Sequence, residues 1–239
     1  MQTSRLAVVL VRLGLAANLG SAARACKNFG VSDLRLVEPA APADEEAGRL
    51  CSGADDVLDG LVRYESLPAA IADFGVVVAT SSLRGRGSHR SLSLAQVPGL
   101  LEEAGKARVA FVFGPEKSGL TEEEMSHASV FLRLPTDPGF PTLNVSHAVA
   151  VTLAASKLTD DGSRVKREDW APSADVESMM GHWDRALEAI GFYETGHRDR
   201  TLRDIRRLIA GRPLSAREVA ILRGVANRVL VSLKRRGNG

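Results

Sequence analysis

From Leu6 to about Lys157, short runs rich in β-forming residues alternate with amphipathic stretches, which is the pattern of a parallel sheet covered by helices. Several of the runs are apolar at every position, as expected of strands that are buried on both faces. The expected strands are Leu6–Val11, Leu34–Val37, Gly75–Thr80, Val109–Phe113 and Val130–Leu134, with a weaker one near Leu61–Tyr64. Helices are expected to start near Ser21, Asp44, Leu67, Leu94, Thr121 and Val145. The alternation predicts an α/β fold built on a parallel sheet.

A polar segment separates this region from a helical one. Residues 159–174 are rich in Asp, Gly, Pro and Ser, a composition typical of a linker. Helical patterning follows at Asp175–Tyr193, Thr201–Ala210 and Ser215–Arg236, and Ser215 and Glu218 have the spacing of a capping box. We therefore expect an α/β domain at 1–158, a linker at 159–174 and a helical extension at 175–239.

Positive charge is concentrated in that extension. The net charge of the 239 residues is only +2, but residues 198–236 contain twelve Arg or Lys and three acids, a local charge of +9. The rest of the chain carries −7. A local excess of this kind is typical of a surface that contacts a polyanion such as nucleic acid, although a solvated helix face would show it too.

The last expected helix has an apolar side and a basic side. Its apolar residues recur at the helical period: Val219, Leu222, Ala226, Val229, Leu230 and Leu233. Arg217, Arg228 and Arg235 lie on the opposite side, where we expect them to contact RNA.

Other sequence features exclude several classes of protein. The apolar run after Arg5 has only about six residues, too short for a signal peptide or a membrane span, so we expect a cytoplasmic protein. Cys26 and Cys51 form no C-x-x-C pair and have no histidine cluster nearby, so neither a disulfide framework nor a metal site is expected. Both thiols are expected to be buried or half-buried.

In open parallel sheets, ligands bind where the chain leaves the carboxyl ends of strands, so the loops after the strands are the informative segments. The first, 18–30, places Asn18 and Arg24 among small residues that let a ligand or another backbone approach closely. Six residues apart, the two could face one loop mouth. A tightly packed helix with a surface arginine is the equally weighted alternative.

The second loop, 113–120, places two glycines and a proline around Glu116 and Lys117. Taken alone, Glu116 is interpreted as a solvated acid beside Lys117. The G-x-x-x-x-G-K-[ST] order is absent, as is G-x-G-x-x-G after a strand, which argues against a nucleotide-dependent hydrolase.

The third segment, 134–150, passes through three prolines into an apolar helix. Thr142 or Asn144 would cap that helix, which is a structural use independent of catalysis. We interpret His147, a lone histidine on the helix, as structural.

Taken together and in this order, the three loops resemble the three motifs of the SPOUT superfamily of RNA methyltransferases. The match is closest to its TrmH-like branch and, within it, to the TrmJ-type tRNA 2′-O-ribose methyltransferases. The resemblance covers residues 5 to about 158. It implies a deep trefoil knot in the C-terminal part of the sheet domain, S-adenosylmethionine bound in the knot, and a homodimer with composite active sites. Periodicity could not have indicated a knot, since threaded chains break the usual topological rules.

Residue by residue, the resemblance implies catalytic roles for Arg24, Asn18, Glu116, Thr142 and Asn144. It implies cofactor contacts from Ala79, Thr80, Ser81, Gly114, Leu134, Thr142 and Leu143. The family usually has Ser at the position of Thr142, often after another small polar residue, whereas here Pro141 precedes Thr142. Threonine keeps the hydroxyl, but its methyl group and the stiff Pro141 could reshape the pocket.

The resemblance implies methylation of a ribose 2′-hydroxyl in tRNA, with position 32 of the anticodon loop as the expected target. Another tRNA site, ribosomal RNA, and a knotted RNA-binding protein without activity are the alternatives. Because the Arg24 guanidinium stays protonated at ordinary pH, we expect it to hold the target phosphate and stabilise alkoxide charge. An arginine acting as the base is the other role considered for this family. The extension is expected to help dimerise the protein and hold tRNA.

Overall fold

The computed structural model describes residues 5–38, 50–80, 90–158, 169–193, 197–209 and 212–236, with side chains described as far as Lys234. Within them, seven strands form one parallel sheet in the order β3-β2-β1-β6-β4-β7-β5. The strands are β1 (Leu6–Val11), β2 (Asp33–Val37), β3 (Val62–Tyr64), β4 (Val76–Thr80), β5 (Arg90–Ser93), β6 (Val109–Phe113) and β7 (Val130–Arg133).

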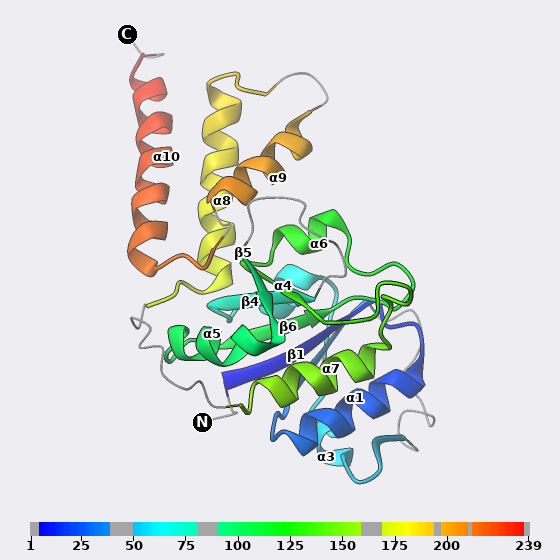
Figure 1. The fold of residues 1–239 in the computed structure, drawn as a ribbon. Coiled ribbons are helices and arrows are strands. Elements are labelled where there is room, and N and C mark those ends of the chain that lie inside the picture. Colours follow the sequence, from blue (N-terminus) through cyan, green and yellow to red (C-terminus); the bar gives the residue numbers. More distant parts are fainter. Residues whose placement is uncertain are drawn as a thin grey trace.

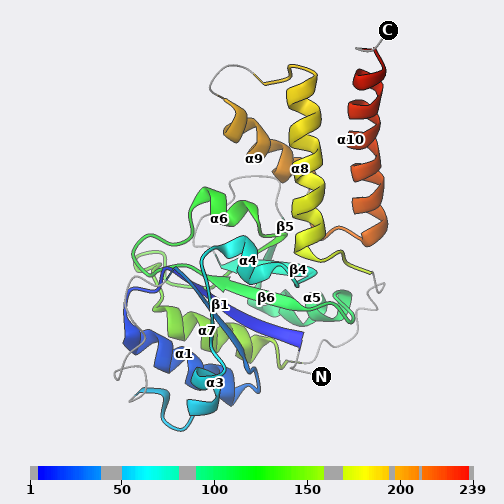
Figure 2. The same ribbon diagram turned by 180° about the vertical axis from the view of Figure 1, so that it is seen from behind.

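Helices cover both faces of the sheet. On one face lie α1 (Ala16–Asn28), α3 (Asp55–Asp59), α5 (Val97–Glu103) and α7 (Val145–Ala155), with α1 packed along α7. On the other lie α4 (Leu67–Ile71) and α6 (Glu122–Ser126). Figure 1 looks onto the α1 and α7 layer, and Figure 2 shows the opposite face.

The two layers follow from the strand sequences. In β1, Leu6, Val8 and Leu10 face the α1 side, and the residues between them face the α4 side. All six residues of β1 are buried, as are all five of its neighbour β6. The apolar runs are therefore the centre of the sheet, as the sequence predicts.

The expected strands are all present, within one residue of their predicted limits, and the predicted parallel α/β fold is confirmed. Strand β5 was not predicted from the sequence, because its four residues, Arg90–Ser93, are mostly polar. A strand at the edge of a sheet pairs on one side only, so it needs no apolar run to be stable.

One predicted helix start is wrong. The first helix begins at Ala16 rather than near Ser21, so Asn18 lies in its first turn. Leu15, the N-cap residue, provides no side-chain hydrogen bond, and small residues such as Gly20 look like a loop in sequence. Here Gly20 is buried in the helix that packs against α7, so close packing outweighs its poor helix propensity.

In the sheet domain, the other predicted helix starts agree or lie outside the described residues. Thr121 caps α6 with the expected capping box, and α4 and α7 begin at Leu67 and Val145. A 3₁₀ turn, η2 (Leu94–Gln96), leads into α5. The start expected near Asp44 lies outside the described residues.

The C-terminal extension is a helical unit with its own small core. Its helices are α8 (Ser173–Ala189), α9 (Arg198–Ile209) and α10 (Ala216–Arg236), and α10 packs along α8. Their core residues include Met179, Met180, Leu202, Ile205 and Val219. Ser215 and Glu218 form the predicted capping box at the start of α10.

The end of the predicted linker is packed against the protein rather than extended. Trp170 is buried and pairs with Ser215, and the backbone N–H of Ser173 donates to the carbonyl of Phe74 at 2.7 Å. The first helix of the extension, α8, starts at Ser173, two residues earlier than predicted. These contacts attach the extension to the sheet domain.

Candidate active site

A cavity of about 920 Å³ opens at the carboxyl ends of β4, β6 and β7. Its wall comes from three places: Thr80 at the end of β4, residues 113–119 after β6, and residues 133–145 between β7 and α7. This is the edge of a parallel sheet at which ligands are expected, and the volume is that of a small-molecule site.

The turn after β6 requires its first glycine. A Cβ on Gly114 would lie 2.5 Å from the backbone nitrogen of Leu120 and 2.6 Å from the carbonyl carbon of Gly119. Gly119 has φ +64°, and its N–H donates to the Pro115 carbonyl at 2.8 Å. The turn closes on itself and presents Glu116 to the cavity.

Glu116, Asn18 and Asn144, which are far apart in sequence, form one chain of hydrogen bonds. Asn18 donates from Nδ2 to Glu116 Oε1, and Asn144 donates from Nδ2 to Asn18 Oδ1 at 2.9 Å. Asn144 Oδ1 in turn accepts from the N–H of Ser146 at 2.9 Å and from its hydroxyl at 2.7 Å. Asn144 is the N-cap of α7, so the start of that helix sets the orientation of both amides.

The interpretation of Glu116 as a solvated acid beside Lys117, which considered the loop alone, is therefore wrong. Glu116 is half-buried and takes its hydrogen bond from Asn18 on α1. A contact across 98 residues of sequence gives no local signal.

Arg24 lies away from this chain of hydrogen bonds. It is exposed in the third turn of α1 and does not line the cavity of its own chain. Six helical residues separate it from Asn18, which turns it about 120° around the helix and moves it about 9 Å along the axis. The expectation that both face one loop mouth is wrong, because the helix begins before Asn18. The catalytic role of Arg24 stays a prediction.

The other site residues expected from the sequence divide into three groups. Thr80, Gly114, Leu134, Thr142 and Leu143 line the cavity. The side chain of Ala79 is buried in the core beneath it, and Ser81 lies outside the described residues. His147, interpreted as structural, is exposed on α7 rather than packed in the core.

An ion pair that was not predicted from the sequence holds the Gly114 turn in place. Arg12, the residue after β1, donates from Nε and Nη2 to the two carboxylate oxygens of Glu124, both at 2.8 Å, and from Nη2 to the Gly119 carbonyl at 3.1 Å. Arg12 has φ +49°, which is unusual for a residue other than glycine. Burial alone would raise the pKa of Glu124, but the hydrogen bonds from Arg12 and Thr121 and the positive charge of Arg12 together outweigh burial and lower that pKa.

Arg133 and Lys117 also line the cavity, and neither was predicted from the sequence to be a site residue. Arg133 ends β7 and is exposed, so it adds a cation beside Thr142 and Leu143. Its place at the end of a strand was the one available signal.

The extension carries the predicted basic helix. On α10, Arg217 and Arg228 are exposed and Val219 and Ala226 are buried, as the helical spacing predicts. The side chain of Arg235 lies outside the described residues. RNA contact by these arginines stays a prediction.

Neither thiol nor metal chemistry is indicated by the described residues. Cys26 and Cys51 are both buried, as expected, and burial raises the pKa of the Cys26 thiol to about 12. In the described ranges, no group of three or more His, Cys, Asp or Glu residues is arranged to hold a metal ion. No helix in those ranges is both long and apolar enough to cross a membrane.

The parallel sheet has its cavity between the Gly114 turn and the segment before α7. Similarity to known protein families identifies the class of protein to which this architecture belongs. Residues 5–154 match the SpoU rRNA methylase family, and residues 174–238 match the C-terminal domain of the tRNA methyltransferase TrmJ. The first match alone covers more than half of the chain, so the chain belongs to the SpoU methylase family.

Within the family, the chain is similar to TrmJ proteins over nearly its whole length. It is 31% identical over 241 residues to the tRNA (cytidine/uridine-2′-O-)-methyltransferase TrmJ of Escherichia coli K12, covering 97% of this chain and 96% of that protein. The crystal structure of TrmJ from Z. mobilis ZM4 superposes with a TM-score of 0.82 at 32% identity, covering 93% and 98% of the two chains. An AdoMet-bound rRNA methyltransferase from Sinorhizobium meliloti superposes with a TM-score of 0.52 at 25% identity, covering 64% and 55%.

Proposed function

We propose that this chain transfers the methyl group of S-adenosylmethionine to a ribose 2′-hydroxyl of tRNA, at position 32 of the anticodon loop. The observation that carries the proposal is the hydrogen-bonded chain of Glu116, Asn18 and Asn144 beside a cavity of small-molecule size. Membership of the SpoU family and the full-length similarity to TrmJ supply the reaction class. Such an enzyme acts where tRNA is, in the cytoplasm.

The residues of the cavity fit S-adenosylmethionine. Leu134, Pro135 and Leu143 offer apolar surface for an adenine ring, while Thr80 and Thr142 offer hydroxyl groups. At Gly114 any side chain would collide with backbone, so the turn keeps its backbone groups accessible to a ligand. We assign Thr80, Gly114, Leu134, Thr142 and Leu143 to the cofactor, with Ala79 and Ser81 beside them at the end of β4.

The cofactor supplies a methyl group that is already activated on a sulfonium. The protein must therefore align the ribose oxygen behind that methyl group and help its proton leave. Glu116 and Asn144 orient the amide of Asn18, and Thr142 adds a hydroxyl on the facing wall. Arg24, protonated at ordinary pH, holds the target phosphate and stabilises alkoxide charge, while phosphate or water takes the proton. Stabilisation of this kind contributes about 3 to 4 kcal/mol.

The exposure of Arg24 supports a composite site in a homodimer, in which Arg24 of one subunit serves the cavity of the other. Exposed apolar residues occur beside the site elements: Leu15 before α1, and Val151 and Leu158 on and after α7. Such residues are a surface for subunit contact. In this dimer Arg24 of one subunit reaches the cavity of the other, whereas Arg24 does not line the cavity of its own chain.

The path of the chain after β7 supports a knot. Residues 134–143 run along the ends of β4 and β6, and α7 then packs against α1 on the far side of β6. The connection between β4 and β5, residues 81–89, lies outside the described residues.

The extension contacts tRNA in this proposal. Its basic character and its match to the TrmJ C-terminal domain support that role, and Arg217, Arg228 and Arg235 are the α10 residues that spacing assigns to it.

Incubating the protein with labelled S-adenosylmethionine and unmodified tRNA, then mapping the methylated ribose, tests this proposal. We expect label at position 32, and we expect Arg24→Ala to lower turnover by about two to three orders of magnitude with cofactor affinity nearly unchanged. Label at another tRNA site or in ribosomal RNA would correct the substrate. Absence of transfer to any RNA would favour an RNA-binding protein without activity. The departure from the family pattern at Pro141-Thr142 is the sequence feature that supports this alternative.

A further inference from the structure

Ion pairs offset part of the positive charge of the extension. Five arginines of residues 198–236 contact acids: Arg198 with Asp184 and Glu188, Arg206 with Glu177, Arg207 with Asp204 and Glu122, Arg212 with Glu218, and Arg223 with Asp175. The charge count of the sequence therefore overstates what a polyanion meets.

Helix α9 keeps cations outside these pairs. Arg200 is exposed and Arg203 half-buried, and neither forms an ion pair with a described acid. With Arg207 they have the spacing i, i+3, i+7, which places all three on one face. The row is about 10 Å long, from a rise of 1.5 Å per residue.

The orientation of α9 is set by its opposite face. Leu202, Ile205 and Ile209 pack into the core of the extension, and Arg206 reaches Glu177 of α8 at 2.7 Å. These contacts turn the row of Arg200, Arg203 and Arg207 outward. We call this row the α9 basic face.

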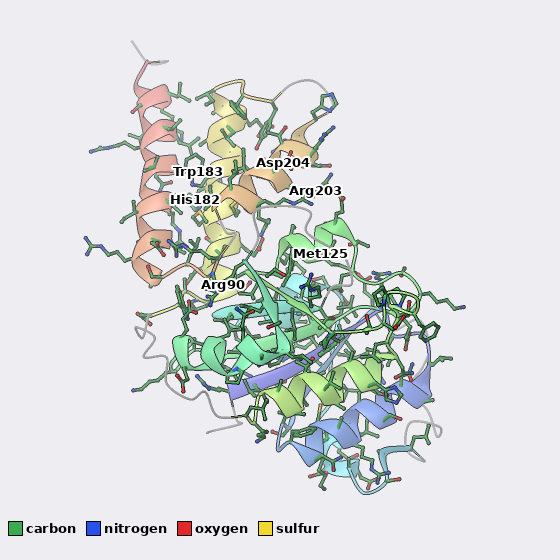
Figure 3. All side chains as sticks on the ribbon, viewed as in Figure 1. Arg90, Met125, His182, Trp183, Arg203 and Asp204 are labelled. Carbon is green, nitrogen blue, oxygen red and sulfur yellow. The ribbon has the colours of Figure 1, made fainter. Side chains whose placement is uncertain are left out.

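The α9 basic face lies next to α6, the helix that follows the Gly114 turn. Helix α9 contacts α6, and Arg207 lies 4.0 Å from Glu122, the first residue of α6. Six residues separate Glu122 from Glu116. Figure 3 shows Arg203 and Asp204 on the α9 side of the extension, above Met125 of α6, with Trp183 between α8 and α10.

Helix α10 is placed differently. It lies on the other side of α8 from α9 (Figures 1 and 2), and its outward face mixes Arg217 and Arg228 with exposed Ile221 and Val225. Ile221 is 56% exposed and Val225 48%. A face that combines apolar and basic residues is a poorer match to a phosphate backbone than a row of cations.

We propose that the α9 basic face binds the phosphate backbone of tRNA and is the principal RNA contact of the extension. The inference rests on the proposed tRNA substrate. Arg200 and Arg203 supply cations that pair with no acid among the described residues. Arg207 adds a third, because its contacts with Asp204 at 3.6 Å and Glu122 at 4.0 Å are long and partly exposed, and such pairs are weak. Because the α9 basic face lies beside α6, it directs the bound RNA toward the Gly114 turn, which carries Glu116.

The test measures tRNA affinity of the full-length protein against salt concentration. For Arg200→Gln/Arg203→Gln we expect the dissociation constant to rise about tenfold, and the slope of log affinity against log salt to fall by about 0.7 to 0.9 for each lost contact. The matched pair Arg217→Gln/Arg228→Gln on α10 should lose less. The proposal would be overturned if the α9 double variant kept the affinity and salt slope of the wild type. It would also be overturned if the α10 double variant lost more tRNA affinity than the α9 double variant.

A substitution of opposite sign separates binding from damage to the fold. Asp204 is 57% exposed and lies within the α9 basic face, so Asp204→Asn should bind tRNA about two to five times more tightly. Weaker binding by this variant would contradict the proposal. If wild-type protein methylates tRNA while the α9 pair binds it normally, only this inference fails. If the wild type neither binds nor methylates tRNA, the proposed function fails with it.

Discussion

At the scale of single residues, orientation matters more than identity in this site. An asparagine amide has a donor end and an acceptor end, and its surroundings decide which end faces a neighbour. Ser146 occupies the acceptor end of Asn144, so Asn144 offers its donor to Asn18, and Asn18 offers its own donor to Glu116. A helix cap thus sets the direction of the hydrogen bond between Asn18 and Glu116.

The Arg12–Glu124 pair is the residue-scale contact with the most direct consequence for the site. A double-mutant cycle of Arg12→Ala and Glu124→Ala should give a coupling energy of about 1 kcal/mol in the free energy of unfolding, because the pair is bidentate and partly buried. Affinity for S-adenosylmethionine should fall in both single variants, since the Gly114 turn loses its support. Arg63→Ala, an exposed arginine on β3, is the control and should change stability by less than about 0.5 kcal/mol. Zero coupling would show that the pair does not hold the turn.

At the scale of secondary-structure elements, one acid joins three helices. Glu177 of α8 contacts His127, which follows α6, at 3.1 Å and Arg206 of α9 at 2.7 Å. Burial alone would raise the pKa of Glu177, but the hydrogen bonds from His127 and Arg206 outweigh it and hold the pKa at about 2. The extension is therefore attached to the sheet domain partly by charge.

This attachment predicts a pH dependence. The folded-state pKa of Glu177 lies below its ordinary value of 4.5, so its carboxylate stabilises the protein above about pH 4.5 and loses that effect as pH falls toward 2. Wild-type protein should be more stable than Glu177→Gln at pH 7, and the difference in free energy of unfolding should shrink across that window. Glu188→Gln removes an exposed acid of the same helix, 55% exposed, and should have little effect. A wild-type advantage that persists unchanged at pH 2 would refute this assignment.

At the scale of the whole molecule, one chain does not bring all of the predicted catalytic residues to its own cavity. Asn18 and Glu116 meet beside the cavity, while Arg24 is exposed elsewhere on α1. The proposed homodimer resolves this, because a two-fold axis brings the same exposed residue of each subunit to the other.

Mixing two inactive variants tests the composite site. Heterodimers of Arg24→Ala and Glu116→Gln subunits contain one intact site if Arg24 acts across the dimer, so random pairing should restore about a quarter of wild-type methyl transfer. If each site used its own Arg24, every site would lack one residue and the mixture would stay inactive. Each variant assayed alone is the control.

Much of the fold was predictable from the sequence, and so were the segments that build the site. Buried parallel strands need apolar runs, and capping boxes need their polar residues at fixed spacing, so β1, β6 and the starts of α6 and α10 have local signals. The edge strand β5 and the early start of α1 were missed because their stability comes from packing and pairing with distant residues.

The sequence by itself determined the parallel α/β sheet, the helical basic extension and the three loops that carry the candidate site, because each of these depends on local periodicity and residue type. Only the tertiary structure decided which side chains meet. It brought Glu116 to Asn18 and Arg12 to Glu124, and it paired half of the described arginines of the extension with acids, leaving Arg200 and Arg203 outward. Hydrogen bonds and ion pairs depend on distances between side chains, and those distances exist only once the chain has folded.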